Sequence, residues 1–490
     1  MSPQNRRQFL GRSLATGLGA GFAIAGTKAS GRILGANDTI RVGVAGLNGR
    51  GGSHVDEFSR MKGVEITYLI DPDTRTYGPK IKAIQARGGS TPRTVTDIRK
   101  ALEDPNLDVV SVAAPNHWHT LITVWSVQAG KDVYVEKPCS HNIHEGRIAV
   151  ETARKHQRIV QHGTQSRSDG HWAELAAAAK KGTYGKLLVS RALCYKPRGS
   201  IGFKANTAPP PQVDFNLWLG PAPDRPFHAN LVLYNWHWFW DFGNGDIGNQ
   251  GVHQMDIARW IIPGATLPKT VQTLGGRFGY YDQGETPNTQ VAVMDFDGTA
   301  LVFEVRGLNT GAYLGEKVGN IAHFEGGVVA PGRGGLRFFP KGKSSESGEP
   351  LPKTEASKRG PGSGHFGNFI AAVRSRKTSD LNADILEGHY SAALCHLANI
   401  SYRLGEVVPF YKKSKALGDS TEMYETLART EEHLADNGIR FDGLEYQVGR
   451  KLTVDAQAEA FVGDPEADKF LTRAYRAPFV VPDKVTLTQG

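Results

Sequence analysis

The sequence predicts an α/β protein with two domains, and three observations support this. Short apolar runs typical of buried strands alternate with helix-like segments over residues 40–160. The first run ends in a glycine-rich turn. Further strand-like runs lie between residues 186 and 306, with a hairpin signal at Asp297-Gly298. With 490 residues, 39% of them hydrophobic, the chain can bury two cores.

The first residues of the chain resemble an export signal. The pair Arg6-Arg7 is followed by Phe9-Leu10 and then by a weakly hydrophobic, glycine- and alanine-rich run over residues 14–25. This order is typical of twin-arginine signals, and the run is shorter than the roughly 20 apolar residues of a spanning helix. We therefore expect residues 1–36 to direct the folded protein through the twin-arginine machinery to the periplasm, without stable membrane insertion.

The glycine-rich turn follows the apolar run Ile40–Ala45. In the usual dinucleotide-binding pattern the middle position is glycine, because the backbone must approach the pyrophosphate closely. Asn48 stands there, and asparagine tolerates left-handed geometry better than other residues except glycine. The residues expected to bind the pyrophosphate are Gly46, Asn48, Gly49, Arg50 and Gly51.

An acidic residue lies at the distance that such a unit requires. The second apolar run, Val64–Ile70, ends in Asp71, twenty residues after Gly51. A carboxylate there can accept hydrogen bonds from both ribose hydroxyls and repels a 2′-phosphate. The sequence therefore favours NAD over NADP, although Arg75 keeps NADP open. The alternative, a βαβ unit without a nucleotide, is disfavoured by the spacing of Asp71.

Two further apolar runs end in polar side chains. One continues into Pro115-Asn116-His117-Trp118-His119 and the next into Glu136-Lys137-Pro138. Because the carboxyl ends of parallel strands meet at one edge of a sheet, we expect Asn116, His119 and Lys137 in one crevice, where nicotinamide would lie. Lys137 is therefore a candidate for chemistry, and a salt-bridged strand end is the alternative.

Taken in order, these pieces resemble the Gfo/Idh/MocA oxidoreductases, the family of glucose-fructose oxidoreductase and inositol dehydrogenase. The resemblance covers about residues 38–345. It implies an N-terminal Rossmann domain, a C-terminal α/β domain with a large, mainly antiparallel open sheet, and a homo-oligomer, either a dimer or a tetramer. It also implies oxidation or reduction of a sugar or polyol hydroxyl. Further cofactor contacts are expected from Pro115, Asn116, His119, Glu136 and Lys137.

The family's second pattern is an Asp-x-x-x-His-x-x-Asp helix, whose histidine acts as acid or base beside the lysine. Here His253 and Asp256 stand where the pattern requires, and Asn249 replaces the first acid. Residues one turn apart share a helix face, so an aspartate would stabilise an imidazolium, whereas Asn249 can only orient the ring. We therefore expect the imidazolium form of His253 to be less favoured. A structural histidine at the domain interface is the alternative.

The densest aromatic cluster of the chain precedes His253, at residues 234–242. Flat aromatic faces beside hydrogen-bonding groups suit a pyranose ring, and a core or interface cluster is the alternative. Either Asp246 or His237 could support the imidazole in place of the missing acid. The candidate substrate contacts are Trp236, His237, Trp238, Asp246 and Asp256.

The candidate catalytic residues are Lys137, His253 and Asn249. Hydride would leave the carbinol carbon for the nicotinamide, while His253 takes the hydroxyl proton and Lys137 stabilises the developing alkoxide. Lys137 could instead accept the proton if burial lowers its pKa. An exported dehydrogenase has no soluble NAD pool, so we expect a tightly held cofactor that a second substrate recycles.

Three functional classes remain open. The first is a sugar oxidoreductase with retained NAD. The second is a glycosidase or lyase that uses the cofactor transiently, through oxidation, elimination and reduction, and the replacement at Asn249 keeps it open. The third is a non-catalytic sugar- or nucleotide-binding protein, which Asn116, Lys137 and His253 together disfavour.

Composition excludes several other classes. The net charge of +9 is modest and scattered, and no basic stripe or nucleic-acid-binding module is present in the sequence. The three cysteines form no disulfide framework, and no Cys/His spacing suggests a metal site. The expected boundaries are 37–160 for the Rossmann domain, 161–345 for the substrate domain, and 346–490 for a loop, helices and a C-terminal extension that packs on the body.

Overall fold

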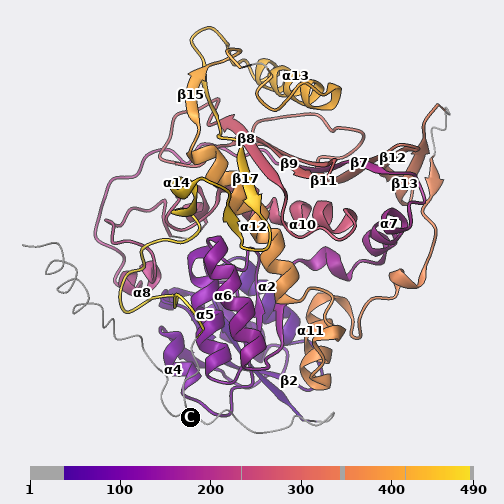
Figure 1. Ribbon diagram of the computed structural model, residues 1–490. Coiled ribbons are helices and arrows are strands. Elements are labelled where there is room, and N and C mark those ends of the chain that lie inside the picture. Colours follow the sequence, from indigo (N-terminus) through magenta and orange to yellow (C-terminus); the bar gives the residue numbers. More distant parts are fainter. Residues whose placement is uncertain (1–37, 233, 343–347, 414, 486–490) are drawn as a thin grey trace, which may run out of the picture.

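The computed structural model describes residues 38–485 except 233, 343–347 and 414, so the expected signal region at 1–36 lies outside the described residues. Figure 1 shows two stacked parts, with the N-terminal domain below a large sheet. No helix in the described part of the chain is long and apolar enough to cross a membrane.

The N-terminal domain is a six-stranded parallel sheet in the order β3-β2-β1-β4-β5-β6. Its strands are β1 (Ile40–Ala45), β2 (Val64–Ile70), β3 (Arg93–Val95), β4 (Val109–Val112), β5 (Asp132–Val135) and β6 (Val160–His162). Its helices are α2 (Arg50–Phe58), α3 (Tyr77–Gln85), α4 (Ile98–Leu102), α5 (Asn116–Gln128) and α6 (Ile143–Lys155). The strand order reverses between β1 and β4, which places a ligand crevice at their carboxyl ends. The Rossmann prediction is confirmed.

Helix α5 begins earlier than the sequence suggested. The pattern of residues 120–129 predicts a helix that begins at Thr120, but α5 starts at Asn116, directly after Pro115. Residues 116–119 therefore form the first helical turn. Proline suits this boundary, because its fixed φ is compatible with entry into a helix.

The second domain is built on a twelve-stranded sheet in which β7 and β10 form the only parallel pair among the described strands. The main path is β14-β13-β12-β11-β7-β10-β9-β8-β16-β15, and β17 joins it at β8 with β18 beyond. The strands are β7 (Leu187–Tyr195), β8 (Thr270–Gly276), β9 (Thr289–Phe296), β10 (Thr299–Arg306), β11 (Val318–Phe324), β12 (Gly327–Gly332), β13 (Gly335–Pro340), β14 (Glu349–Pro350), β15 (Glu406–Pro409), β16 (Glu445–Val448), β17 (Leu452–Asp455) and β18 (Ala460–Phe461). This confirms the large, mainly antiparallel sheet.

The predicted hairpin lies between β9 and β10. Its central residues, Asp297 and Gly298, have φ of 55° and 85°, so both occupy the left-handed region that a two-residue hairpin requires. The side chains of β10 then alternate between the faces of the sheet. Leu301 and Phe303 face one core, and Val302 faces another.

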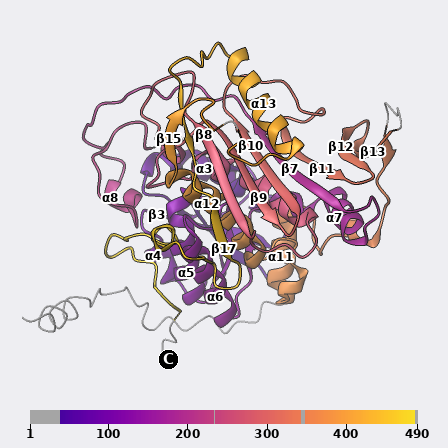
Figure 2. The ribbon, with the colours of Figure 1, turned by 45° about the horizontal axis from the view of Figure 1, so that its top comes forward.

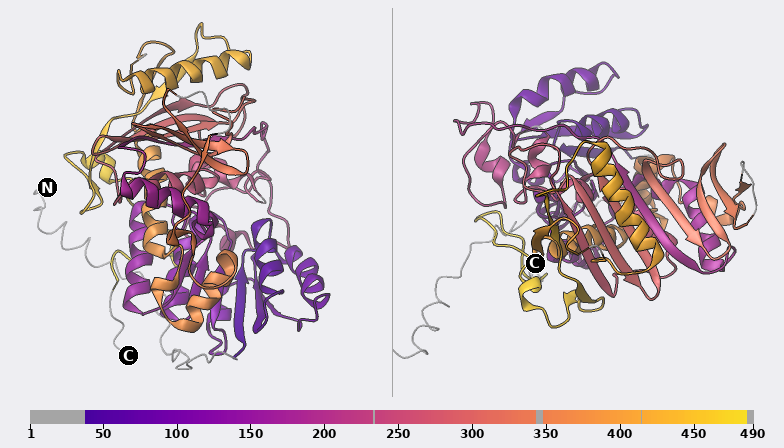
Figure 3. Two further views of the ribbon diagram at one scale, coloured as in Figure 1. Left: turned by 90° about the vertical axis from the view of Figure 1, so that its right-hand side faces the viewer. Right: turned by 90° about the horizontal axis from the view of Figure 1, so that it is seen from above.

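Helices cover the two faces of the large sheet differently. Helices α7 (Gly170–Lys181), α10 (Val252–Ile261) and α12 (Ile385–Arg403) pack on the face towards the N-terminal domain. Helix α13 (Thr421–Asp436) lies across the opposite face (Figures 2 and 3). The segment after 345 therefore contributes strands and helices to the body, and α11 (Gly364–Ser375) packs on the core of β1.

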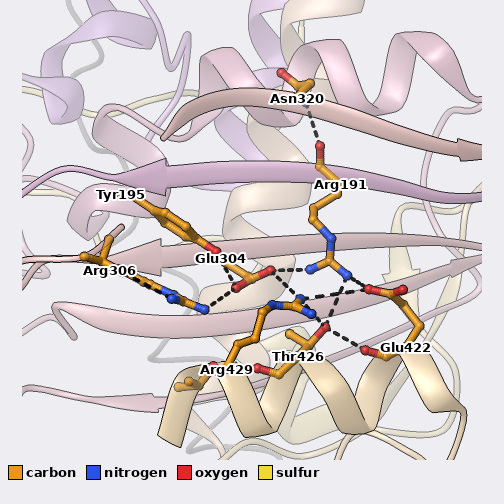
Figure 4. Close-up of polar contacts among 10 residues, drawn as sticks. Arg191, Tyr195, Glu304, Arg306, Asn320, Glu422, Thr426 and Arg429 are labelled. Carbon is orange, nitrogen blue, oxygen red and sulfur yellow. Dashed lines mark hydrogen bonds and ion pairs between the residues drawn. The ribbon is translucent and has the colours of Figure 1, made fainter. Parts of the chain in front are cut away.

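A buried ionic cluster attaches α13 to the sheet (Figure 4). Arg191 from β7 is fully buried and pairs with Glu304 from β10 and Glu422 from α13. Glu304 also accepts hydrogen bonds from Arg306 at 3.0 Å and from Arg429 of α13 at 3.3 Å. Burial alone would raise the pKa of Glu304, but the guanidinium groups around it lower that pKa to about 2. The cluster therefore holds an ionised carboxylate between sheet and helix.

The substitution Glu304→Gln should destabilise the protein strongly. It leaves Arg191, Arg306 and Arg429 without their shared counter-charge, which costs about 3–5 kcal/mol in the free energy of unfolding. Because the folded-state pKa lies below the usual 4.5, the contribution is present above pH 4.5 and is lost as pH falls towards 2. Urea unfolding measures both effects. Glu355→Gln, which breaks only the exposed pair with Lys358, should change the free energy by less than about 1 kcal/mol. An equally small effect at Glu304 would contradict the account.

Candidate functional site

A cleft of about 640 Å³ lies at the carboxyl ends of the Rossmann strands, between the two domains. The N-terminal domain contributes the glycine-rich turn and the ends of β2, β4 and β5, and the second domain contributes the opposite wall. The residues predicted from sequence that line it are Gly46, Asn48, Gly49, Arg50, Asp71, Pro115, Asn116, His119, Glu136, Lys137, Trp236, Asn249 and His253.

The glycine-rich turn is packed so tightly at Gly46 and Gly51 that larger residues do not fit there. A Cβ at Gly46 would lie 2.4 Å from the amide nitrogen of Ala114, and a Cβ at Gly51 would lie 1.8 Å from the carbonyl oxygen of Gly46. Left-handed φ occurs at Gly46 and Gly49 and not at Asn48, so the reason expected for asparagine is wrong. Helix α2 follows without a side-chain cap, and the N–H groups of Gly51 and Gly52 donate to the carbonyl oxygens of Asn48 and Gly49 at 3.1 and 3.0 Å. The N-terminus of the helix still carries a partial positive charge that favours an anion. The turn thus fits the pyrophosphate of a dinucleotide.

Asp71 is bound to the backbone around it. Its carboxylate accepts hydrogen bonds from the N–H of Leu47 at 2.7 Å and of Asp73 at 2.8 Å. Burial raises the pKa of Asp71 to about 6, although these hydrogen bonds oppose the shift. Asp71 therefore fixes the turn as well as facing the cleft. Arg75 donates to Asp73 at 2.7 and 2.6 Å, so its guanidinium is held beside a carboxylate.

Glu136 joins helix α2 to the end of β5. Its Oε1 accepts a hydrogen bond from Arg50 Nε at 2.7 Å and lies 3.1 Å from His54 Nε2, while His54 Nδ1 lies 2.7 Å from the Ser111 hydroxyl. Burial alone would raise the pKa of Glu136, but His54, Arg50 and Lys137 hold it well below its usual value. An ionised carboxylate thus stands beside Lys137. Neither His54 nor Ser111 carried a local sequence signal.

Lys137 and His253 line the cleft from opposite domains. Lys137 Nζ donates a hydrogen bond to the main-chain oxygen of Asn249, and burial lowers its pKa although Glu136 opposes the shift. Burial, followed by the charge of Lys137, lowers the pKa of His253 to about 3. The imidazole is therefore neutral at pH 7, and no hydrogen bond joins it to another residue in the described segments. It is a ring that can accept a proton.

Asn249 and His253 do not share one helix as expected. Helix α9 (Gly245–Asn249) ends before α10 begins at Val252. The break falls at Gly251, where a Cβ would lie 2.4 Å from Cζ of Phe303 and 2.6 Å from the carbonyl oxygen of Ile247. The short connection still brings Asn249 and His253 to the same wall of the cleft.

Two family models match the chain. Residues 40–164 match an oxidoreductase family model described as an NAD-binding Rossmann fold, and residues 195–315 match that family's C-terminal alpha/beta domain. Together the matches span half of the chain. The chain belongs to the Gfo/Idh/MocA family.

Curated relatives of this Gfo/Idh/MocA protein align over part of their length. A glycosyl hydrolase family 109 protein of Solibacter usitatus is 33% identical over 171 residues, which is 32% of this chain and 38% of the relative. One of Shewanella pealeana is 30% identical over 138 residues, which is 27% of this chain and 30% of the relative. The chain thus matches about a third of the length of these relatives.

Solved structures share the fold of this family member. The WlbA dehydrogenase of Bordetella pertussis, in complex with NADH and UDP-GlcNAcA, is 18% identical with a TM-score of 0.55, covering 74% of this chain and 97% of that one. A putative oxidoreductase from Klebsiella pneumoniae is 16% identical with a TM-score of 0.53, covering 81% of this chain and 100% of that one. The two-domain arrangement is therefore common to them.

The aromatic cluster of this Gfo/Idh/MocA chain faces the cleft only in part. Trp236 lines the cleft, but Trp238 is 2% exposed and packs in a core with Phe239 and Phe242. His237 is also buried, with Nδ1 2.6 Å from the Tyr234 carbonyl oxygen. His237 and Trp238 are therefore buried beside the cleft, which corrects the expectation that they contact the substrate. The residues form a 3-10 turn, which directs neighbouring side chains to different sides.

Both acidic residues expected at the substrate lie outside the cleft lining. Asp246 accepts hydrogen bonds from Arg198 at 2.9 and 2.7 Å, and Asp256 accepts from Arg167 at 3.0 and 2.9 Å and from Ser391 at 2.6 Å. Buried carboxylates require such partners. Asp246 and Asp256 therefore have a structural role, which corrects the expectation that they contact the substrate.

His119 lines the cleft, but its ring is engaged elsewhere. Nδ1 lies 2.5 Å from the carbonyl oxygen of Pro138, and Nε2 lies 2.6 Å from that of Ala114. His119 therefore links the chain after β4 to the chain after β5. Its ring nitrogens thus position the two strand ends, and the expected cofactor contact stays a prediction.

Tyr234 and Asn116 complete the cleft. Tyr234 is 49% exposed, and its hydroxyl accepts a hydrogen bond from Asn249 Nδ2 at 3.0 Å. Asn116 Nδ2 donates to Asn244 Oδ1 at 3.3 Å and so spans the two domains. Sequence reasoning missed Tyr234 and Asn244 as site residues, and for Tyr234 the only available signal was its membership of the aromatic cluster.

The substitution Gly51→Ala should weaken NAD binding by at least about tenfold, because the new Cβ displaces the carbonyl of Gly46 and opens the turn. Fluorescence titration with NADH measures the dissociation constant. Gly311→Ala is the matched control, since a Cβ there meets nothing within 4 Å. Equal affinities in the two variants would contradict the tight-turn account.

Cofactor affinity should fall as pH drops through about 6, where Asp71 becomes protonated and loses acceptor capacity. The free energy of unfolding depends on pH in the opposite sense. Because the pKa of Asp71 is raised in the folded state, its contribution to stability is fully present below pH 3.8 and is lost as pH rises through 6. Titrations of NAD binding from pH 5 to 7.5 measure the change in affinity, and thermal unfolding over the same range measures the change in stability. An unchanged pH profile in Asp71→Asn would refute this assignment.

Proposed function

We propose that the protein is an NAD-dependent oxidoreductase that acts on a hydroxyl of a sugar, polyol or glycoside and retains its cofactor. One observation carries the proposal: Lys137 of the Rossmann domain and His253 of the second domain line one cleft beyond a turn that fits a pyrophosphate. Such a pair supplies a hydrogen-bond donor and a proton acceptor to the same substrate oxygen.

NAD bound in the cleft would accept a hydride from the carbinol carbon of the substrate. Neutral His253 accepts the hydroxyl proton, and Lys137, held by the carbonyl of Asn249 and beside ionised Glu136, donates a hydrogen bond to the oxygen. Lys137 can exchange roles with the histidine, because burial lowers its pKa as well. Asn249 orients Lys137 through its main-chain carbonyl oxygen.

A sugar is the substrate class that the cleft wall suits best. Trp236 and Tyr234 line the cleft, and the amide of Asn249 donates a hydrogen bond to the Tyr234 hydroxyl at 3.0 Å. A C–H face of a pyranose can stack on such rings while its hydroxyls are bonded at the edge. The Bordetella pertussis structure of the same fold contains a nucleotide sugar, which supports this class.

A second candidate is an NAD-dependent glycosidase or lyase that oxidises, eliminates and reduces again. The relatives named glycosyl hydrolase family 109 proteins favour it, as does amide Asn249 in place of the family's acid. Chromogenic glycosides in deuterated water distinguish the two. Release of the chromophore with deuterium in the sugar and no net NADH indicates the elimination cycle, and net NADH without cleavage indicates the oxidoreductase.

We also propose that the folded protein is exported to the periplasm by the twin-arginine route. The pair Arg6-Arg7 and the weakly hydrophobic run after it support this. Export in the folded state would carry the dinucleotide along, which is the reason to expect a retained cofactor.

The substitution Lys137→Ala should lower kcat by about a hundredfold to ten-thousandfold, the usual contribution of a positioned proton-transfer group, while NAD stays bound. Turnover and bound nucleotide are measured on the same sample. Lys181→Ala, at the exposed end of α7, serves as the control. Normal turnover in the Lys137 variant would exclude the proposed role.

A further inference from the structure

A segment of the second domain crosses the Rossmann domain directly after Asp71. The N–H of Thr74 donates to the carbonyl of Gln212 at 3.0 Å, and the N–H of Asp214 donates to the carbonyl of Pro72 at 2.9 Å. In a Rossmann domain the residue at the end of β2 marks the adenosine ribose. The crossing segment therefore lies at the adenosine end of the cleft.

Helix α8 (Phe215–Leu219) follows this crossing and forms part of the cleft wall through Leu217 and Trp218. Trp118, in the first turn of α5, donates from Nε1 to the carbonyl oxygens of both residues at 3.1 Å. A Cβ at Gly220 would lie 2.2 Å from the Trp118 ring. Helix α8 is therefore seated against α5 with little space between them.

The C-terminal strap, residues 475–482, supports α8 from outside. Figure 1 shows this yellow segment passing beside α8 and α5. Arg476 donates from Nη2 to the carbonyl of Asn216 at 2.6 Å and from Nε to the carbonyl of Gly220 at 3.1 Å. A guanidinium group on main-chain oxygens forms charge-assisted hydrogen bonds, which are stronger than neutral ones. Arg476 thus binds the main chain at both ends of α8.

Phe479 anchors the strap three residues further on. Its ring is 1% exposed and lies 5.4 Å from Trp118 and 6.5 Å from Trp125, centroid to centroid. The guanidinium of Arg476 lies 5.1 Å above the same ring. Trp118 therefore contacts the strap on one side and holds the carbonyls of α8 on the other. Movement of α8 away from the cleft requires these contacts to break.

We propose that Arg476 and Phe479 are positioning residues that hold α8 closed over the adenosine half of the cofactor and so set the rate at which the cofactor leaves. The inference rests on the proposed function, since it requires a dinucleotide in the cleft. The segment that retains the cofactor is then the C-terminal strap, which lies more than a hundred residues beyond the second family match. The strap acts through its contacts with α8 and Trp118. A closed wall slows release without altering the groups that react.

The test measures release of NADH directly. Protein loaded with NADH is mixed with a large excess of NAD, and the loss of bound-NADH fluorescence gives the dissociation rate. Arg476→Ala should release NADH at least about tenfold faster, since three charge-assisted hydrogen bonds to Asn216 and Gly220 are lost. Arg476→Lys, which keeps one charged donor, should be intermediate. Arg450→Ala is the matched control, because its partners Asp464 and Glu466 lie outside the strap, and its rate should equal that of the wild type.

Phe479→Leu provides a second variant, which keeps an apolar anchor and should give a smaller acceleration than Arg476→Ala. At saturating NAD, kcat should stay at the wild-type value in each strap variant, because the reacting groups are untouched. A wild-type release rate in Arg476→Ala overturns the inference, and so does a loss of kcat that added NAD does not restore. Failure of the wild type to bind NADH in the initial titration would instead refute the proposed function.

Discussion

The contact between Lys137 and the main-chain oxygen of Asn249 joins the two domains at the point where chemistry is proposed. On one side, Lys137 follows β5 and is preceded by Glu136, which Arg50 and His54 bind to the glycine-rich helix. On the other, Asn249 ends α9 and stands just before the helix that carries His253. This interdomain contact therefore fixes Lys137 against the wall of the cleft that carries His253.

Burial sets the proton chemistry of the cleft. It lowers the pKa of both Lys137 and His253, and the charge of Lys137 lowers the pKa of His253 further. The nearby ionised Glu136 favours the charged lysine, while Asn249 adds no negative charge beside the imidazole. The pair is thereby biased towards one proton, on lysine, with histidine left neutral. This distribution suits donation to an alkoxide by lysine and proton acceptance by histidine.

Features encoded locally were predictable from the sequence. Each of these features depends on residues within a short window of the sequence: the alternating strands, the turn at Gly46, the acid at Asp71, and Lys137 at a strand end. Long-range features were not predictable. His54 meets Glu136 across 82 residues, and Arg476 meets Asn216 across 260.

The wrong expectations concern the direction of side chains. Trp238 and Asp256 stand in the right stretches but point into the core, because one turn or one partner decides where a side chain faces. Trp236, two residues before Trp238, reaches the cleft. The helix expected through Asn249 and His253 is interrupted at residues 250–251, where the backbone keeps helical angles but the N–H of Gly251 donates to the carbonyl of Asp246, five residues back, at 2.8 Å.

The most direct test of the account is the nucleotide content and redox response of protein purified without added cofactor. Native mass spectrometry identifies what is bound, and absorbance then follows the same sample as a panel of sugars and glycosides is added. The account predicts one NAD per chain that survives dialysis and becomes persistent NADH with a sugar substrate. Protein that carries no dinucleotide and takes none up on titration would contradict it.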